Sequence, residues 1–263
     1  MNLIRVVVNG ASGRMGQEVI NALCHEPEMK IVGAAELKVT KGSLSLPDVS
    51  ESIPFSSNLE QLIIDFKPDV LVDFTTATAV MPTVRISAKH NVNMVIGTTG
   101  LTNEDISEIE QLSKAHQIGI IVAPNFAIGA ILMTHMAKIA SKYLDHAEII
   151  ELHHNLKIDA PSGTALNTAR IMAASKGKPF SQNQEKQNFE SRGYFIEGIP
   201  IHSVRLPGLM AHQEVIFGTS GQTLRIRHDT INRECYMPGT ILAIKEVVKR
   251  QGLTYGLDSL LNL

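Results

Sequence analysis

The first half of the chain alternates short apolar segments with segments of helical periodicity. The apolar segments are rich in Val and Ile and have no polar face, which predicts strands that are buried on both sides. Helical segments of roughly 10–15 residues between such strands indicate a parallel sheet covered on both faces, a doubly wound α/β fold. The predicted strands are 3–8, 30–36, 69–74, 92–100 and 118–126, and the predicted helices are 14–25, 58–66, 79–90 (with Pro82 in its first turn) and 103–116.

From about residue 145 the pattern changes to strands with short connections. Strands are predicted at 147–154, 201–208, 213–220 and 222–229, with one helix at 162–175 and a long polar surface loop at 175–193. A run of strands after an alternating half predicts a second, α+β domain. We expect a first domain over 1–125, a second over 126–233, and a last helix at 234–249 within a segment, 234–263, that packs back on the first.

Composition argues against several classes of protein. Of the 263 residues 44% are hydrophobic, and the formal charge is −2 with scattered basic residues, which disfavours nucleic acid and anionic membranes as partners. The apolar stretch 127–140 includes His135 and Lys138 and is too short to span a bilayer. The chain enters a strand without a signal-peptide pattern, and Cys24 and Cys235 match no metal-ligand spacing, so we expect a cytoplasmic protein.

The first strand leads into the glycine-rich turn VNGASGRMGQ. Gly10, Gly13 and Gly16 allow a tight turn and close approach of a ligand, and the following helix N-terminus suits a pyrophosphate. Glu36 lies at the end of the second predicted strand, where an acidic residue binds a ribose hydroxyl, so this unit predicts dinucleotide binding. Glu36 favours NAD, whereas Lys38 could meet the 2′-phosphate of NADP. The alternative is a glycine-rich turn with a purely structural role that binds no ligand.

Two further strand ends are predicted at the same edge of the sheet. They are GTTG at 97–100 and APNF at 123–126. Ligands of this fold bind at the carboxyl ends of the strands. Small residues there would let a nicotinamide ring lie close, and Phe126 could pack on it. Taken alone, each segment could equally be an ordinary loop.

The segment ELHHNLKIDAPSGTAL, residues 151–166, is the candidate catalytic segment. His153 can exchange a proton near neutral pH, and Lys157 could be a second donor or a fixed cation for an anionic substrate. The helix start at Ser162 and Gly163 would offer free amides to a carboxylate. The structural alternative is a half-buried histidine pair followed by a helix cap. No third ligand supports a metal site.

These motifs resemble those of the dihydrodipicolinate reductase family of lysine and diaminopimelate biosynthesis. The matching segments are VNGASGRMG, DFT, VIGTTG, APNFAIG and, most specifically, ELHHNLKIDAPSGTAL, in the family's order from residue 6 to about 240. The resemblance implies a Rossmann-like N-terminal domain and a second α+β domain for substrate binding and oligomerisation. It implies NADH- or NADPH-dependent reduction of (hydroxy-tetra)hydrodipicolinate, a cyclic dicarboxylate, to tetrahydrodipicolinate, by a homotetramer joined through second-domain sheets.

The resemblance also implies roles for individual residues. His153 would donate or accept a proton, Lys157 would donate one, and Arg233 would lie at the return hinge between the domains. The substrate would be bound by His154, Gly163 and Thr164. The cofactor would be bound by Gly10, Ala11, Ser12, Gly13, Arg14, Met15, Glu36, Gly97, Thr98, Thr99, Ala123, Pro124, Asn125 and Phe126.

Two other functions are compatible with parts of the sequence. Another two-domain Rossmann oxidoreductase, acting on a semialdehyde or an amino acid, would share the glycine turn. It has no reason to contain a histidine pair, a lysine and an SGT helix start in one segment. A nucleotide sensor without enzymatic activity would need the cofactor half only.

Overall fold

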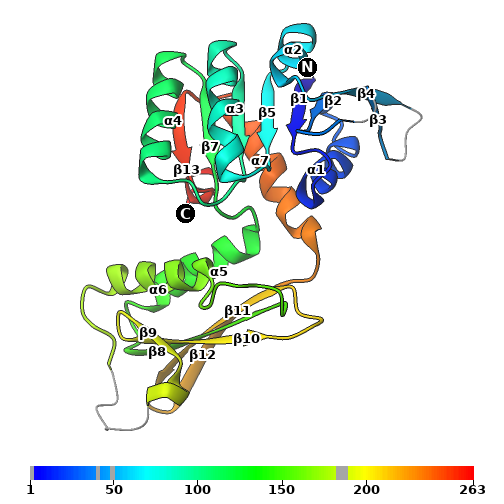
Figure 1. Ribbon diagram of the computed structural model, residues 1–263. Coiled ribbons are helices and arrows are strands. Elements are labelled where there is room, and N and C mark those ends of the chain that lie inside the picture. The colour runs from blue at the N-terminus through cyan, green and yellow to red at the C-terminus, as the bar shows by residue number, and fades with distance from the viewer. Residues whose placement is uncertain (1–2, 40–41, 48–50, 182–188) are drawn as a thin grey trace. The chain divides into compact units, whose positions relative to one another are not determined.

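The computed structural model describes residues 3–39, 42–47, 51–181 and 189–263, and the chain divides into two compact units (Figure 1). The first unit comprises Met1–Ala127 and Arg233–Leu263, and the second comprises Ile128–Asn232. The polypeptide therefore leaves the first unit once and returns to it. Within the described residues, no helix is long and apolar enough to cross a membrane.

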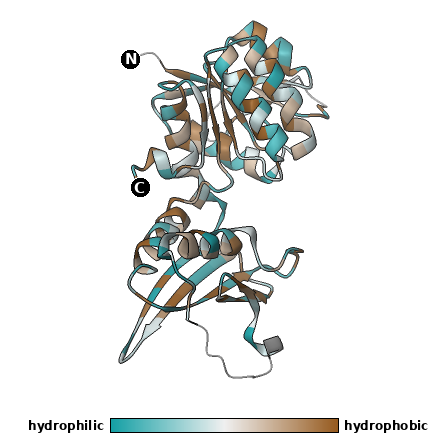
Figure 2. Cartoon of the chain, turned by 90° about the vertical axis from the view of Figure 1, so that its left-hand side faces the viewer, coloured by the Kyte–Doolittle hydropathy of each residue, from teal (hydrophilic) through white to brown (hydrophobic). Residues whose placement is uncertain are grey.

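The first unit contains an eight-stranded sheet in the order β13-β7-β6-β5-β1-β2-β4-β3. All neighbouring strands are parallel except β3 and β4, which are antiparallel at one edge. The central strands are mostly hydrophobic (Figure 2), and their Val, Ile and Leu residues are almost all buried. The strands are β1 (Ile4–Asn9), β2 (Met29–Ala35), β3 (Ser43–Ser45), β4 (Ser52–Ser56), β5 (Val70–Asp73), β6 (Asn93–Ile96), β7 (Gly119–Val122) and β13 (Gly252–Tyr255).

Helices cover both faces of this sheet. Helices α2 (Leu59–Phe66), α3 (Ala77–Lys89) and α4 (Asn103–Ala115) pack side by side on one face. Helices α1 (Arg14–Cys24) and α7 (Met237–Val247) pack together on the other (Figure 1). Strand β1 lies between β2 and β5, so the strand order reverses there. In a doubly wound sheet this reversal opens a crevice at the carboxyl ends of the strands.

The second unit contains a five-stranded sheet in the order β12-β11-β8-β10-β9. Helices α5 (Ile128–Ala140) and α6 (Gly163–Lys176) pack against each other on one face of it (Figure 1). Their apolar residues enclose a core with Ile149, Val215 and Phe217 of the sheet. The strands are β8 (His146–His153), β9 (Tyr194–Ile196), β10 (Ile199–Arg205), β11 (Ala211–Thr219) and β12 (Gln222–Thr230), and Phe189–Arg192 forms a short 3-10 helix.

The predicted fold class is confirmed, but the sequence pattern misses several elements. Helix α5 has exposed apolar side chains as well as buried ones, so no polar stripe marks its helical period. The missed strands β3, β4, β9 and β13 are short, and a few residues show too little alternation to be recognised. Of the predicted loop at 175–193, residues 182–188 lie outside the described residues.

Two smaller differences between the predicted and the observed helices involve prolines. Pro82 lies inside α3, which begins at Ala77, and not in the first turn as predicted. The predicted helix at 234–249 is a 3-10 turn, Arg233–Tyr236, followed by α7. Pro238 stands at the start of α7, where its missing N–H costs no helical hydrogen bond.

Gly119 of β7 provides a test of the packing of α7. A Cβ atom at this position would lie 2.4 Å from the carbonyl oxygen of Val247 and 2.8 Å from that of Arg250. We expect Gly119→Ala to lower the free energy of unfolding by about 1–3 kcal/mol because the backbone must move. Gly42→Ala is the control, since nothing lies within 4 Å of a Cβ atom there. Equal urea midpoints for the two variants would contradict this packing.

Candidate functional site

The turn between β1 and α1 has no room for a side chain at two of its glycine positions, Gly10 and Gly16. Gly10 has φ +81°, and a Cβ atom on it would lie 2.8 Å from the carbonyl oxygen of Phe74. A Cβ atom on Gly16 would lie 2.1 Å from the carbonyl oxygen of Gly10. The N–H of Gly13 donates to that same carbonyl at 3.0 Å. The two glycines therefore hold a tight turn at the carboxyl end of β1.

The N-terminus of α1 is suited to an anion. Gly13 is its N-cap and provides no side-chain hydrogen bond, and the first turn contains no acidic residue. The turn is exposed at Ser12, Gly13 and Arg14. Helix N-terminal amides and their partial positive charge attract phosphate groups. The residues at this position thus fit a dinucleotide pyrophosphate.

The carboxylate of Glu36 lies beside the same turn. Its Oε2 accepts a hydrogen bond from the N–H of Ser12 at 3.2 Å, and its Oε1 accepts one from the N–H of Leu37 at 2.9 Å. Glu36 is only partly buried. A partly exposed acceptor at the end of β2 matches the position that binds ribose hydroxyls in this type of fold.

A buried carboxylate, missed by the sequence analysis, connects three strand ends. Asp73 is fully buried at the end of β5, and its Oδ2 accepts from Asn9 Nδ2 at 2.8 Å. Its Oδ1 accepts from the hydroxyls of Thr75 and Thr98, both at 2.8 Å. Asp73 thereby connects the carboxyl ends of β1, β5 and β6. In the sequence, the sign of this role was a charged residue, Asp73, within the otherwise apolar segment VLVDF.

The predicted nicotinamide segments follow β6 and β7. A Cβ atom on Gly97 would lie 2.0 Å from the Phe74 ring, so this ring packs directly on the Gly97 backbone. The rings of Phe74 and Phe126 have centroids 5.5 Å apart, and Phe126 is buried. Phe126 therefore packs within the protein. Of the remaining residues in these segments, Ala123 and Thr98 are buried, Asn125 is partly buried, and Thr99 and Pro124 are exposed.

In the second unit, the candidate catalytic segment is organised by Glu151 of β8. This carboxylate is completely buried and lies two residues before His153, on the same face of the strand. His153 Nδ1 lies 2.5 Å from Glu151 Oε2, and the N–H of Ser162 donates to Oε1 at 3.2 Å. The Glu151 side chain therefore connects the end of β8 with the start of α6.

Arg205 of β10 completes this cluster from a distant part of the sequence. Its Nη1 and Nη2 donate to the two oxygens of Glu151 at 2.8 and 2.7 Å. Nη2 also donates to the carbonyl oxygen of Asp159 at 2.8 Å, and the Asp159 carboxylate accepts from Lys157 Nζ at 2.6 Å. Arg205 thus links the buried carboxylate to the loop that contains Lys157.

The electrostatics of the cluster favour an ionised Glu151. Burial, the largest single effect, raises its pKa, but hydrogen bonds from His153, Arg205 and Ser203 outweigh it and lower the pKa of Glu151 to about 2. The hydrogen bond from Lys157 likewise lowers the pKa of Asp159. The cluster therefore contains two carboxylates that accept hydrogen bonds from cationic side chains.

The start of α6 lies next to this cluster. Ser162 is the N-cap, and its side chain accepts from the N–H of Ala165 at 3.2 Å. Gly163 and Thr164 are exposed, and a Cβ atom on Gly163 would meet nothing within 4 Å. No contact inside the described part of the chain requires a glycine there. His154 is also exposed, so a ligand can approach His154 and the α6 amides from solvent.

Neither Glu151 nor Arg205 was predicted from the sequence as a functional residue. Glu151 lies within the motif, and its signal was a glutamate between apolar residues, two positions before a histidine. Arg205 gave no local signal, because it meets Glu151 only through the pairing of β10 with β8. Arg233, the predicted hinge residue, is the first residue of the chain's return to the first unit.

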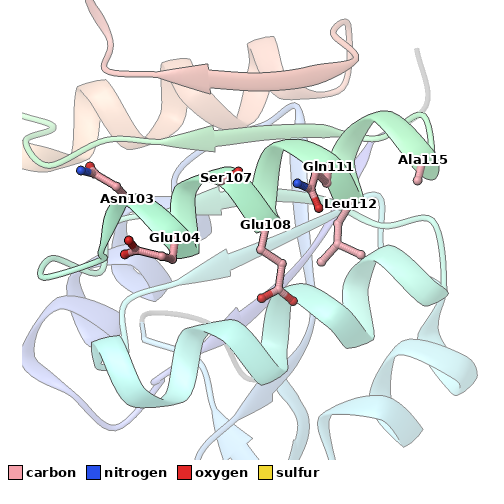
Figure 3. Close-up of a pocket in the computed structure, with 7 residues that line it drawn as sticks. All are labelled: Asn103, Glu104, Ser107, Glu108, Gln111, Leu112 and Ala115. Carbon is pink, nitrogen blue, oxygen red and sulfur yellow. The ribbon is translucent and has the colours of Figure 1, made fainter.

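Two other features do not contribute to this site. A hollow lined by residues of α4 contains none of the predicted site residues (Figure 3). Among the described residues, no group of three or more His, Cys, Asp or Glu could hold a metal ion. The hollow is lined by Asn103, Glu104, Ser107, Glu108, Gln111, Leu112 and Ala115.

Comparison with known proteins extends over the whole chain. The family model described as "Dihydrodipicolinate reductase, N-terminus" matches residues 4–126, and "Dihydrodipicolinate reductase, C-terminus" matches residues 129–261. A 4-hydroxy-tetrahydrodipicolinate reductase of Dehalococcoides mccartyi is 56% identical over 263 residues, all of both chains. One from Moorella thermoacetica is 48% identical, with 98% of each chain covered. The family resemblance seen in the motifs is confirmed.

Solved structures give the same result. The dipicolinate-bound dihydrodipicolinate reductase from Paenisporosarcina sp. has a TM-score of 0.86 and 42% identity, covering 98% of this chain and 99% of that one. An amine dehydrogenase from Mycobacterium smegmatis has a TM-score of 0.66 at 16% identity, covering 95% of this chain and 94% of that one. This second similarity is evidence for the fold alone.

The lowered pKa of Glu151 predicts a pH-dependent contribution to stability. Its ordinary value is 4.5 and its value in the folded protein is about 2, so the stabilisation is present above pH 4.5 and is lost as the pH falls towards 2. The contribution is about 3 kcal/mol for such a shift. We expect Glu151→Gln to be less stable than the wild type at pH 7, with the difference narrowing below pH 4.5. Urea unfolding of both proteins at several pH values measures this difference. A difference in the free energy of unfolding that stays constant down to pH 3 would contradict the prediction.

Proposed function

The chain belongs to the dihydrodipicolinate reductase family, and we propose that it reduces (hydroxy-tetra)hydrodipicolinate to tetrahydrodipicolinate in diaminopimelate and lysine biosynthesis. Relatives with this name match over the full length of the chain. The observation that best supports the site is the cluster around Glu151, which brings His153, the Lys157 loop and the start of α6 together. Similarity to dehydrogenases acting on other substrates is restricted to the fold.

The protein uses a nicotinamide cofactor, and we propose that this is NADH or NADPH. Residues Gly10–Met15 would hold the pyrophosphate at the start of α1, and Glu36 would bind the adenosine ribose. The segments 97–99 and 123–126 would line the nicotinamide. The tight glycine turn and the uncapped α1 N-terminus support this placement.

The substrate is a small cyclic dicarboxylate, and we propose that it binds in the second unit. The exposed amides of Gly163 and Thr164 at the start of α6 would hold one carboxylate, assisted by His154. Lys157, which is 22% exposed, would add a fixed positive charge. Fixing the substrate carboxylate in this way orients the reacting carbon of the substrate.

Proton transfer is the chemical task of the chain's own residues. When bound, the reduced nicotinamide supplies a hydride to the conjugated C=C–C=N system of the substrate. The negative charge that develops must be neutralised by a proton. We assign the donor to His153 or Lys157, since both can release a proton near the α6 carboxylate seat.

Substitution of these two residues tests the assignment. We expect His153→Gln to lower kcat by about a hundredfold or more while cofactor affinity is nearly unchanged, because only proton transfer is lost. Lys157→Ala is expected to lower kcat and to raise KM for the dicarboxylate, because the cation serves both steps. Steady-state kinetics with enzymatically generated substrate measures both.

Matched variants in the first unit serve as controls for these substitutions. His116→Gln changes a histidine at the C-terminal end of α4, and Lys114→Ala breaks the ion pair with Glu110. Both controls are expected to keep wild-type kinetics. Near-normal kcat for His153→Gln and Lys157→Ala alike would show that the assigned roles are wrong.

Glu36 is expected to influence the choice between NADH and NADPH. Its carboxylate would accept from ribose hydroxyls and repel a 2′-phosphate, whereas Lys38 offers a positive charge. We therefore expect Glu36→Ala to raise the ratio of kcat/KM for NADPH to that for NADH by about tenfold, or about 1.4 kcal/mol. Glu18→Ala on α1 is the control, and an unchanged ratio in Glu36→Ala would contradict the role of Glu36.

We further propose that the protein is a homotetramer joined through the second-unit sheets. Helices α5 and α6 lie on one face of the sheet (Figure 1), and residues alternating with the core residues point to the other. That face contains half-buried apolar side chains next to exposed arginines, a mixture typical of protein interfaces. These residues are Ile150, Leu152, Val204, Ile216, Arg225 and Arg227.

Light scattering coupled to size-exclusion chromatography tests the assembly. We expect the wild type to elute with the mass of four chains and Ile216→Glu to dissociate, because moving a carboxylate from water into an interface has a desolvation cost. Ile64→Glu on α2 is the control, since Ile64 is exposed outside this sheet. A wild-type mass of one chain would contradict the proposal.

A further inference from the structure

The hydrogen bonds at Glu151 determine which nitrogen of His153 bears a proton. Four N–H donors surround the carboxylate: His153 Nδ1, the N–H of Ser162, and Nη1 and Nη2 of Arg205. An ionised carboxylate only accepts hydrogen bonds, and its pKa of about 2 keeps Glu151 ionised at neutral pH. At 2.5 Å from Oε2, Nδ1 must therefore be the donor.

The consequence concerns the other nitrogen. If Nδ1 is protonated in both charge states of the ring, Nε2 alone gains and loses a proton. An orienting carboxylate that selects the tautomer of a catalytic histidine has a large effect on rate in other enzymes. The same arrangement also fixes the ring plane, because Glu151 is fully buried and held on both oxygens.

We propose that Glu151, held by Arg205, is a positioning residue that keeps His153 protonated at Nδ1 and leaves Nε2 to exchange the proton with the substrate. This inference rests on the proposed function, in which His153 takes part in proton transfer. In the step itself, the Nε2–H bond breaks as the proton moves to the substrate carbanion, leaving a neutral ring with Nδ1–H. The proton at Nε2 is then regained from solvent.

Arg205 has a specific part in this arrangement. It is paired with His153 in the β10–β8 register, and its two Nη atoms occupy both carboxylate oxygens. Without this cation the buried charge of Glu151 would be compensated only by His153 and neutral donors, at a considerable desolvation cost. On the other side of His153, β11 places Ala211, which has no charge. The remaining charged groups nearby, Lys157 and Asp159, pair with each other.

Nitrogen-15 NMR of the ligand-free protein reads the tautomer directly, without relying on activity. With His153 assigned by its absence in His153→Gln, we expect the neutral wild-type ring to be protonated at Nδ1. In Glu151→Gln the side chain has a single oxygen to accept hydrogen bonds, so we expect the Nδ1–H preference to be lost. A wild-type ring that is protonated at Nε2 when neutral overturns the proposal.

Kinetics distinguishes positioning from a purely structural role. We expect Glu151→Gln to lower kcat at least about tenfold with NADH affinity retained, and the loss should not exceed that of His153→Gln. In the His153→Gln background, adding Glu151→Gln should lower kcat by a much smaller factor than in the wild type, because the part of its effect that passes through His153 is already lost. A single urea transition like that of the wild type shows that the variant is folded in both units, and Glu197→Gln, in the turn between β9 and β10, is the control.

Two kinetic results would overturn the proposal. One is a kcat of Glu151→Gln within about twofold of wild type while His153→Gln is strongly impaired. The other is an equal loss from Glu151→Gln in both backgrounds, which would mean that Glu151 only supports the loop and α6. Failure of the proposed function would differ from both, because His153→Gln itself would then retain normal kcat.

Discussion

The buried carboxylate of Glu151 is the interaction on which the second-unit site depends. Removing a carboxylate from water costs several kcal/mol, so such a group is retained only where donors replace its hydration. Arg205 provides a bidentate pair, and His153, the Ser162 amide and Ser203 donate to the same carboxylate. Loss of any one partner leaves the others with an unfavourable buried group. The side chains proposed for catalysis and the start of α6 are therefore fixed together.

The first unit also contains a buried carboxylate at the end of a strand, but with different hydrogen-bond partners. Asp73 is buried at the carboxyl end of β5, but its donors are the neutral side chains of Asn9, Thr75 and Thr98. It orders the ends of the strands next to which the segments proposed for cofactor binding lie, while Phe74 packs against Gly97 and Phe126. In each unit, one acidic residue at a strand end positions the loops that follow. Membership of the reductase family gives both arrangements a purpose, since the first unit would bind the nicotinamide cofactor and the second is where we propose that the dicarboxylate binds.

Much of this architecture could be predicted from local sequence, because parallel strands buried on both faces read as unbroken apolar runs. The glycine turn was equally visible, since Gly10 and Gly16 are required by local backbone contacts. Helix α5 could not be recognised, because its exposed face is also apolar. Arg205 could not be found at all: 54 positions separate it from Glu151, and only the β8–β10 pairing brings them together. The contact of Phe126 with Phe74 could not be predicted either, because it joins distant segments.

The most direct test is a crystal structure of the protein with a reduced nicotinamide cofactor and dipicolinate. We expect His153 Nε2 and Lys157 Nζ to lie within hydrogen-bonding distance of the diacid, with a carboxylate at the amides of Gly163 and Thr164. The contacts of Glu151 with His153 Nδ1 and Arg205 should be unchanged. A diacid bound away from the start of α6, with Nε2 of His153 turned away from it, would contradict the account.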